Sequence, residues 1–361
     1  MIDTDLLQRL WDAAPQVDLS EAWPADQMRW LEEAGVLRWG IPEELGGQSI
    51  SAADQLGGYQ SLAANCMTTA FILTQRVAAI SRVVASVNQP ARERWLPKLA
   101  TGEAFSTVGI SHLTTSRQHL RTPAVRVVID GDKLTLNGSI PWVTGAAHAD
   151  LIVTGGTCDD GRQCLIALPT AAPGVSVDPH AHLLALTASH TATVQLENVE
   201  LSAECLLAGP VENLMSAGKG GGTGSLTTSF LALGLAQRVQ TFLVEQEKLR
   251  PDLQPVVRSL VSEIVNLHLD MNFALTHPDE TAERYSAASI RQRVNSLAVR
   301  VSQAALGISK GAGFVRGHVA ERSVREAMFF LVWSCPQPVV QGGLEELVCR
   351  GNNAGFGPET E

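Results

Sequence analysis

The chain has 361 residues, of which 45% are hydrophobic and 18% charged, which excludes a disordered protein and allows about two or three compact units. The net charge of −10 and the lack of a Lys/Arg block argue against nucleic acid or an anionic membrane as the main partner. No apolar run reaches the length of a membrane span, and the first residues lack a signal peptide's basic region. Six scattered cysteines without Cys-x-x-Cys spacing indicate reduced thiols, so we expect a cytoplasmic protein without a zinc site.

Residues 1–103 predict an N-terminal helical domain. Gly and Pro interrupt the helical pattern over residues 39–47, and the Ala-, Leu- and Val-rich stretch 60–86 favours a buried pair of helices. Pro and Gly in residues 92–103 stop the last helix. Before the interruption, apolar residues recur near helical spacing at Met28, Trp30, Leu31, Ala34 and Leu37.

Residues 104–209 change to the alternating pattern of strands. Alternation on both sides of a turn at 130–133 is the signature of a hairpin. Apolar runs at 151–153 and 165–168 flank a second turn, and a last strand pattern spans 194–201. Several short strands between turn signals predict a small antiparallel barrel or sandwich.

Residues 210–350 return to helical periodicity and predict a C-terminal bundle. One apolar stripe runs through residues 231–242. Long stripes separated by short Gly breaks are typical of helix bundles. Residues 351–361 predict a loose tail. The second stripe is formed by Ile290, Val294, Leu297, Val301, Ala305 and Ile308.

The segment 136–145 lies near the middle of the strand region and reads Leu-Asn-Gly-Ser-Ile-Pro-Trp-Val-Thr-Gly. It resembles the "L-N-G-x-K-x-W-I-T" segment of the acyl-CoA dehydrogenase family, in which the Trp and Thr lie against the flavin ring of FAD. The resemblance implies that Trp142 and Thr144 contact a flavin, since an indole offers a flat apolar wall and a hydroxyl can donate to a ring heteroatom. The alternative for this segment alone is a strand with a buried Trp and a turn.

Three further segments, 39–47, 92–103 and 191–201, resemble the same family. The resemblance implies an α+β fold with an N-terminal helical domain, a middle antiparallel β-barrel or sandwich and a C-terminal four-helix bundle. It also implies bound FAD, an acyl-CoA or similar small-molecule substrate, and a homodimer or homotetramer. The resemblance also implies an electron-transfer partner.

Residues 108–117 take the place of the family's flavin-contacting segment. Ile110 keeps a β-branched residue beside the ring and Ser111 keeps a hydroxyl, so the resemblance implies that both bind the cofactor. Ser116 falls near the Ser that contacts the acyl-CoA ligand in the family. His112 replaces a Glu, and we interpret it as a polar wall or a packed residue. The alternative is a hydroxyl-rich turn without a ligand.

The family's catalytic base is absent from both of its known positions. Residues 321–327 resemble the family segment "E-R-x-x-R-D-A", and counting onward places Ser334 at the Glu of the "Y-E-G-T" turn. An unassisted hydroxyl cannot remove the α-proton of a thioester. The other position, before the preceding long helix, falls on residues 224–225, Gly-Ser. The catalytic residues are therefore unknown from the sequence, and we expect Glu326 to pair with an Arg.

The segments that hold the dinucleotide end of FAD in the family are also weakened. Its "R-x-x-F-G" segment is absent or shortened near residues 247–251, and its Gly-rich loop survives only as residues 307–313. Pro336 and Pro338 replace the Thr and Gln of "G-T-x-Q", and proline cannot donate a backbone hydrogen bond. The cofactor is therefore FAD held differently, a smaller flavin such as FMN, or none.

Two motifs point to other chemistry. Residues 307–311 match Gly-x-Ser-x-Gly, but a nucleophile elbow requires a strand–turn–helix and here a helical stripe precedes the Ser. The Gly-rich residues 218–225 resemble a phosphate cradle, although we favour a mobile loop. His180 and His182 show no metal spacing, and we expect them to be solvated.

Three functions stay open from the sequence. The first is a flavin-dependent oxidoreductase that removes hydrogen from the α and β carbons of an acyl thioester, with a base from an unidentified place. The second is a flavin monooxygenase of the same fold, which uses reduced flavin and O₂ and does not need the Glu. The third is a non-catalytic binding or scaffold protein that lacks the base.

Overall fold

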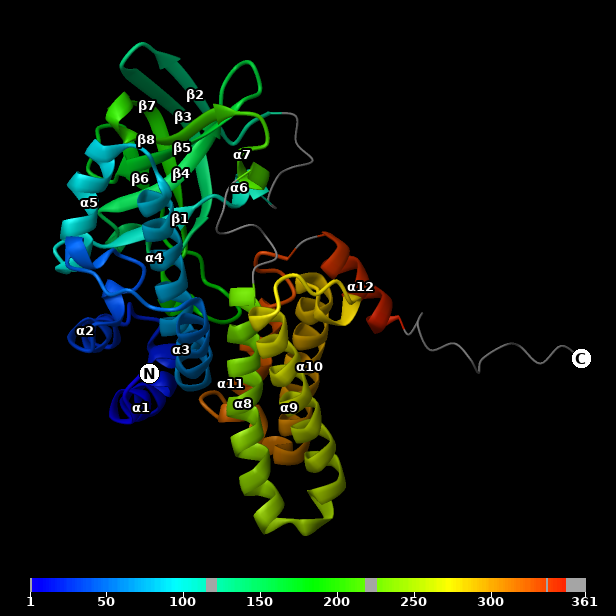
Figure 1. Ribbon diagram of the computed structural model, residues 1–361. Coiled ribbons are helices and arrows are strands. Elements are labelled where there is room, and N and C mark those ends of the chain that lie inside the picture. The colour runs from blue at the N-terminus through cyan, green and yellow to red at the C-terminus, as the bar shows by residue number, and fades with distance from the viewer. Residues whose placement is uncertain (1, 115–121, 218–225, 336, 349–361) are drawn as a thin grey trace, which may run out of the picture.

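The computed structural model describes residues 2–114, 122–217, 226–335 and 337–348. Helices come first along the chain, strands follow, and long helices end it, so the predicted α+β architecture is confirmed (Figure 1). No helix in these described ranges is both long and apolar enough to cross a membrane.

Five helices occupy the first hundred residues. Side chains at the preceding positions cap three of them, because Asp3 Oδ1 accepts from the Asp5 amide at 3.4 Å, Ser51 Oγ from the Asp54 amide at 3.0 Å and Asn88 Oδ1 from the Ala91 amide at 3.1 Å. The predicted buried helix pair is confirmed as α3 and α4, separated only by Cys66. The helices are α1 (Thr4–Ser20), α2 (Ala25–Glu33), α3 (Ala52–Asn65), α4 (Met67–Ala85) and α5 (Gln89–Ala100).

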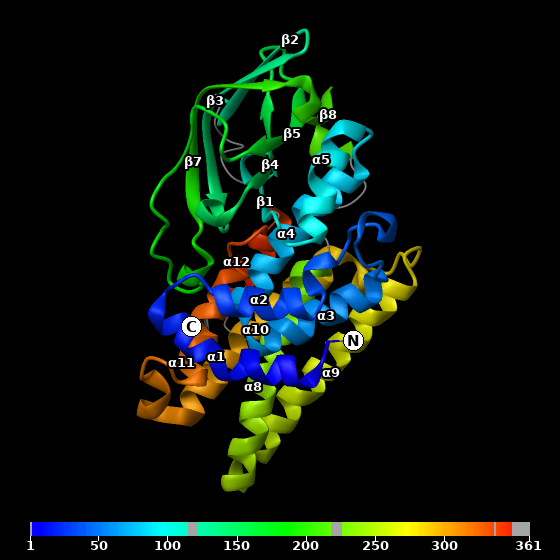
Figure 2. The ribbon, with the colours of Figure 1, turned by 90° about the vertical axis from the view of Figure 1, so that its left-hand side faces the viewer.

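The strands form one curved sheet in the order β6-β7-β3-β2-β4-β5-β8, with β1 paired to β4 (Figure 2). The predicted hairpin is confirmed, since β2 and β3 pair antiparallel around Asp130 and Lys133. Most pairings are antiparallel as predicted, but β4 pairs parallel to both β1 and β2. The strands are β1 (Ser106–Gly109), β2 (Val125–Asp130), β3 (Lys133–Val143), β4 (Leu151–Thr157), β5 (Gln163–Pro169), β6 (Val175–Val177), β7 (Ala192–Ser202) and β8 (Leu206–Val211).

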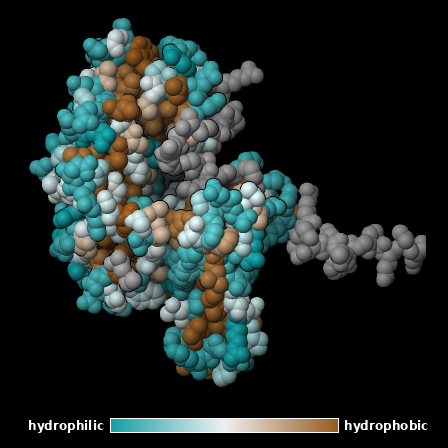
Figure 3. Space-filling view, in the orientation of Figure 1, coloured by the Kyte–Doolittle hydropathy of each residue, from teal (hydrophilic) through white to brown (hydrophobic). Residues whose placement is uncertain are grey.

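Long helices follow the sheet and project away from it as a bundle (Figure 1). The stripe predicted on α10 is confirmed, because its residues from Ile290 to Ala305 are buried in the helical core. An apolar stripe also faces solvent along the projecting helices (Figure 3). Separately, Val256, Val265 and Leu269 are exposed. Short helices α6 (Ser111–Thr114) and α7 (Leu214–Ala217) precede α8 (Leu226–Leu249), α9 (Gln254–Thr276), α10 (Ala287–Ser309), α11 (Val319–Phe329) and α12 (Gln337–Leu347).

Helix α4 belongs to two hydrophobic cores. Its first half, including Phe71 and Leu73, packs in the core shared with α8, α10 and α11. Its second half, including Ile80 and Val83, packs with α5 and with β1, β4 and β5. The apolar residues around most of its circumference explain this position, since a helix that is hydrophobic on all sides is buried. The helix therefore joins the helical layer to the sheet.

The buried Arg76 ties α4 to the segments around it. Its guanidinium donates to the carbonyls of Leu37 at 3.2 Å, Leu99 at 2.6 Å and Ala104 at 3.3 Å. The Leu99 and Ala104 carbonyls lie just before β1, and the Leu37 carbonyl lies in the turn after α2. The hydrogen bonds therefore fix where the chain enters the sheet. Burial lowers the pKa of Arg76 to about 10, and the side chain stays charged at neutral pH.

Candidate functional site

A cavity of about 940 Å³, here called the central cavity, lies where α4, the end of β3 and the turn after α11 meet. Its volume is at the upper end of the range for small-molecule and cofactor sites. Four residues singled out from the sequence line it together, namely Ile110, Ser111, Trp142 and Thr144. Ser334 lines it as well, from the opposite, helical side. The structure thus brings together residues that are more than 200 positions apart in the sequence.

Trp142 reaches the cavity because β3 is irregular near its end. The register between β3 and β7 shifts between Ile140 and Val143, and Trp142 has φ +59°. A bulge of this kind re-aims a side chain, and Pro141 fits there because it needs no hydrogen-bond partner for its nitrogen. The indole is 58% exposed. The alternative of a buried Trp on a regular strand is therefore wrong.

A chain of hydroxyl groups supports the same wall. The hydroxyl of Thr144 lies 3.2 Å from that of Thr191, which lies 2.9 Å from that of Ser189. Thr107 Oγ1 donates to the Thr144 carbonyl at 2.7 Å and Ser111 Oγ donates to the Pro141 carbonyl at 3.2 Å. These bonds hold the strand ends, and Ser111, Thr144 and Thr191 line the cavity.

Aromatic side chains form the helical wall opposite. The Phe329 and Trp333 rings stack with centroids 5.1 Å apart, and Phe71 meets both edge-on at 4.8 and 5.0 Å. Arg291 on α10 donates to the Trp333 carbonyl at 2.9 Å, which fixes the turn that carries Ser334. Ser334 has φ +46°, an uncommon conformation for a side chain other than glycine.

Within the part of the chain that the structure describes, the lining of the central cavity contains no Asp, Glu or His. Its charged members are Arg82 and Arg325, and Arg325 is paired with Asp18 and Glu321. Although burial opposes it, hydrogen bonds to these two carboxylates raise the pKa of Arg325. Burial also raises the pKa of the Tyr59 hydroxyl. Neither group can accept a proton from a substrate at neutral pH.

Glu326, at the family's Asp position, is not part of the cavity lining. It is 3% exposed and accepts a hydrogen bond from the fully buried Arg238. The expected pairing with an Arg is therefore confirmed. His112 lies beside β4, with Nε2 3.0 Å from the Gly155 carbonyl, so it is a packed residue and not a member of the cavity lining.

A histidine cluster that sequence reasoning missed lies next to the cavity. His190 Nε2 is 3.2 Å from the Glu21 carbonyl, which can only accept, so His190 Nδ1 is the acceptor for His148 Nε2 at 2.9 Å. His180 stacks on His190 with ring centroids 4.1 Å apart. His180 is therefore half-buried, so the expectation that it is solvated holds only in part, whereas His182 is largely exposed as expected. Among the described residues no group of three metal-binding side chains is placed to hold a metal.

The cluster predicts a loss of stability in mild acid. Burial, then the neighbouring His190 and His180, lower the pKa of His148 below its ordinary 6.5, and burial lowers that of His190. The folded state binds fewer protons than the unfolded state in this range, so its stability falls as the pH falls below about 6.5. We expect the melting temperature to drop from about pH 7.5 to about pH 5.5, and to drop less in His190→Gln. His277→Gln is the control variant. An equal drop in melting temperature in His190→Gln and in the wild type would contradict this prediction.

Several residues from the sequence analysis lie elsewhere. Ser116, residues 218–225, Pro336 and the tail beyond residue 348 lie outside the described residues. Ser309 of the Gly-x-Ser-x-Gly match is the last residue of α10, so no strand precedes it and it is not a nucleophile elbow.

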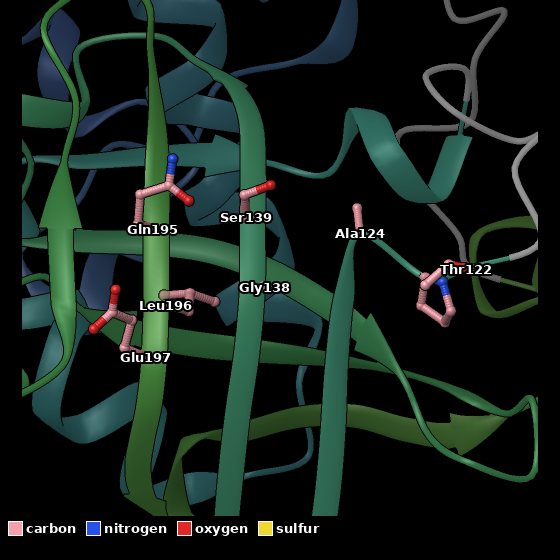
Figure 4. Close-up of a pocket in the computed structure, with 8 residues that line it drawn as sticks. Thr122, Ala124, Gly138, Ser139, Gln195, Leu196 and Glu197 are labelled. Carbon is pink, nitrogen blue, oxygen red and sulfur yellow. The ribbon is translucent and has the colours of Figure 1, made fainter.

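A second, shallower groove of about 490 Å³ lies over β2, β3 and β7 (Figure 4). Ser139 and Gln195 project from neighbouring strands there, with Thr122 on the far side of the groove. Gln195 is already engaged, since its Nε2 donates to Asp178 Oδ2 at 2.7 Å. The described lining of this groove has no aromatic ring. The central cavity is therefore the better candidate for a flat redox cofactor.

Comparison with solved structures defines the class of protein. Butyryl-CoA dehydrogenase from Megasphaera elsdenii superposes with a TM-score of 0.81 at 18% identity, over 95% of each chain. KijD3, solved in complex with FMN and dTDP-3-amino-2,3,6-trideoxy-4-keto-3-methyl-D-glucose, superposes with a TM-score of 0.77 at 20% identity, over 96% of this chain and 91% of KijD3. The chain has the acyl-CoA dehydrogenase fold.

The sequence comparisons add the family. Residues 6–103 match the family model described as acyl-CoA dehydrogenase, N-terminal domain. The mitochondrial short-chain specific acyl-CoA dehydrogenase of Bos taurus is 22% identical over 338 residues, which cover 89% of this chain and 81% of that protein. Together these matches support membership of the acyl-CoA dehydrogenase family.

Proposed function

We propose that this member of the family is a flavin-dependent monooxygenase, an oxidoreductase that does not need a carboxylate base. One observation carries the proposal: the described lining of the central cavity holds aromatic rings, hydroxyls and two arginines but no Asp, Glu or His. Removing the α-proton of an acyl thioester requires such a base within hydrogen-bond reach. Oxygen transfer from O₂ with reduced flavin has no such requirement.

The aromatic and aliphatic side chains and the hydroxyl groups that line the cavity suit a flavin. Trp142 would cover one face of the ring, Ile110 would pack beside it, and the hydroxyls of Ser111 and Thr144 would meet its polar edge. Bound reduced flavin would supply two electrons, so that one atom of O₂ enters the substrate and the other leaves as water. The chain's own residues bind and orient the reactants and exclude water.

The sequence outside the described ranges supports the same proposal. Residues 115–121 and 218–225, the two internal segments nearest in sequence to the cavity walls, contain no Asp or Glu. A carboxylate base from this chain would therefore have to come from its last residues or from outside the walls that surround the cavity.

Acyl-thioester dehydrogenation is the second candidate. It is favoured by the similarity to acyl-CoA dehydrogenases over most of the chain. It would require a base from a second copy of the chain or from a rearranged loop. The domain boundaries at 103/104 and 209/210, a homo-oligomer and an electron-transfer partner stay predictions. The apolar stripe that faces solvent on the projecting helices (Figure 3) supports an oligomer.

A flavin titration followed by two challenges separates the candidates. We expect the protein to take up FMN or FAD, to retain its visible absorbance when butyryl-CoA is added without oxygen, and to consume O₂ when reduced flavin is supplied with a substrate. Bleaching by butyryl-CoA would reject the monooxygenase proposal and favour the dehydrogenase. Failure to bind either oxidised or reduced flavin would reject both and leave a scaffold protein.

Trp142→Ala tests the placement of the ring. An aromatic contact contributes about 0.5–1.5 kcal/mol beyond its buried area, so we expect flavin affinity to fall about tenfold or more. Fluorescence titration with FMN measures this fall. Trp30→Ala on α2, where the indole lies under Arg9 and away from the cavity, is the matched control. Equal affinities for the two variants would place the ring elsewhere.

A further inference from the structure

Helices α3 and α8 contribute a wall of the central cavity that is separate from the residues proposed to hold the flavin. Gln55 and Tyr59 line the cavity from α3, and Thr228 lines it from the first turn of α8. Gln55 and Tyr59 are four positions apart, so they lie on the same side of their helix. The two helices pack closely, since a Cβ added at Gly234 of α8 would meet the Gln60 carbonyl of α3 at 2.3 Å. This wall therefore offers the cavity neutral hydrogen-bonding groups.

Tyr59 is held in place by its ring. The residue is 3% exposed and belongs to the helical core, where its ring meets that of Trp39 edge-on with centroids 6.0 Å apart. Gly58 leaves room for the same indole, because an added Cβ would lie 2.4 Å from the Trp39 ring. The packing of the ring thus fixes the position of the Tyr59 hydroxyl.

The hydroxyls of Tyr59 and Thr228 have no hydrogen-bond partner among the residues that the structure describes. Both residues are more than nine-tenths buried, since Thr228 is 6% exposed. Neither oxygen is fully enclosed, in contrast to the unpartnered Oγ of Ser229, so both oxygens reach the open space of the cavity. A buried tyrosine hydroxyl usually has a partner, and an unpaired one destabilises the fold. A bound ligand would supply the missing partner.

The chemistry of the Tyr59 hydroxyl makes it a neutral donor. Burial raises its pKa, so the group keeps its proton at neutral pH. The described lining of the cavity contains no Asp, Glu or His that could accept this proton. An oxygen atom of a ligand is therefore the acceptor that suits it.

We propose that Tyr59 and Thr228 form hydrogen bonds with an oxygen atom of the substrate and so determine which substrates the cavity accepts. The substrate class is an uncharged molecule that carries a carbonyl or hydroxyl oxygen on an apolar frame. The frame would pack against the rings of Phe71, Phe329 and Trp333. This proposal rests on the proposed function in one respect, that the central cavity holds the substrate. It adds the chemistry by which that substrate is recognised.

A pair of probes with matched shape tests the recognition of the oxygen. Calorimetric titration compares 4-phenyl-2-butanone with 2-methyl-4-phenyl-1-butene, in which a methylene group replaces the carbonyl oxygen. The ratio of the two affinities, ketone over alkene, is compared between variants, so the different hydration of the two probes cancels. We expect Tyr59→Phe to lower this ratio about tenfold, because the ketone loses a hydrogen bond and the alkene no longer leaves a hydroxyl unpaired. Thr228→Val should lower it by a smaller factor.

Tyr285→Phe is the matched control, because Tyr285 is the only other tyrosine of the chain and its ring packs on Phe273, away from the cavity lining. It should leave the ratio unchanged. Tyr59→Phe should melt at the temperature of the wild type or above it, since the lost hydroxyl makes no hydrogen bond within the protein. A lower melting temperature would show that the hydroxyl is bound within the fold and would overturn the proposal. An unchanged ratio in Tyr59→Phe or in Thr228→Val would overturn it as well.

A second arm distinguishes an oxygen of the substrate from an oxygen of the flavin. We expect Tyr59→Phe to bind FMN as tightly as the wild type in a fluorescence titration. Weaker binding of FMN, with an unchanged ratio for the two probes, would assign the hydroxyl to the flavin and overturn the proposal. The probe titrations are made on both flavin-loaded and flavin-free protein. A failure to bind flavin, which would reject the proposed function, therefore still leaves the ratio to be measured.

Discussion

Ser334→Glu is expected to raise the rate at which butyryl-CoA bleaches the flavin-loaded protein by a factor of roughly 10²–10⁴, the usual contribution of a positioned base. Ser334 lines the central cavity together with Trp142, and the apolar rings of Phe329 and Trp333 would raise the pKa of a new carboxylate toward neutral. Its φ of +46° is already adopted by a side chain other than glycine, so the backbone can accept Glu without a new turn. Anaerobic stopped-flow absorbance measures the effect.

Ser334→Gln is the matched control, since it has the size of Glu but cannot accept the proton. Equal bleaching rates in the two variants would show that position 334 does not face the reacting carbons. Rapid bleaching of the wild type would instead show that a base comes from elsewhere. Either result would also bear on the monooxygenase proposal, because that proposal depends on the missing carboxylate.

Glu326→Ala should cost about 3–5 kcal/mol of unfolding free energy, the loss expected when one member of a buried ion pair is removed. Glu326 is the only carboxylate within salt-bridge distance of Arg238 or Arg322 among the described residues. Both arginines are at most 2% exposed. Without Glu326, two buried positive charges would face each other in the core between α8 and α11. Urea denaturation measures the change.

Glu200→Ala provides the comparison, because Glu200 pairs with Lys133 at the exposed side of the sheet and such pairs contribute about 0–1 kcal/mol. Adding Arg238→Met to Glu326→Ala should recover part of the loss by removing one unpaired charge. A single Glu326→Ala variant as stable as Glu200→Ala would mean that water or another group compensates the arginines.

The elements with strong periodicity could be predicted from the sequence. The stripe from Ile290 to Ala305 repeats at helical spacing and becomes the buried face of α10. The hairpin of β2 and β3 follows from alternation around a turn, and its register pairs Asp130 with Lys133. In contrast, β8 (Leu206–Val211) was missed, because its Gly209 and Pro210 do not read as strand residues.

Two of the cavity-lining residues could be predicted because they sit in one short segment. Trp142 and Thr144 are two positions apart, so a local motif carries them together. The direction in which the Trp142 indole points could not be predicted. It depends on a bulge between β3 and β7 that only the pairing of the strands reveals.

The histidine cluster escaped sequence reasoning for a different reason. His148 comes from the connection between β3 and β4, whereas His180 and His190 come from the connection between β6 and β7, and no spacing in the sequence links them. Contacts between distant segments are set by packing, which periodicity within a segment does not report.

The sharing of α4 between two cores limits how ligands can enter and leave. A hinge motion that swings the helices away from the sheet would have to break the packing of either Phe71 and Leu73 or Ile80 and Val83. Local openings that disturb little buried surface cost far less free energy. Ligands that enter the central cavity therefore have to pass through its rim, where Leu184 is 66% exposed.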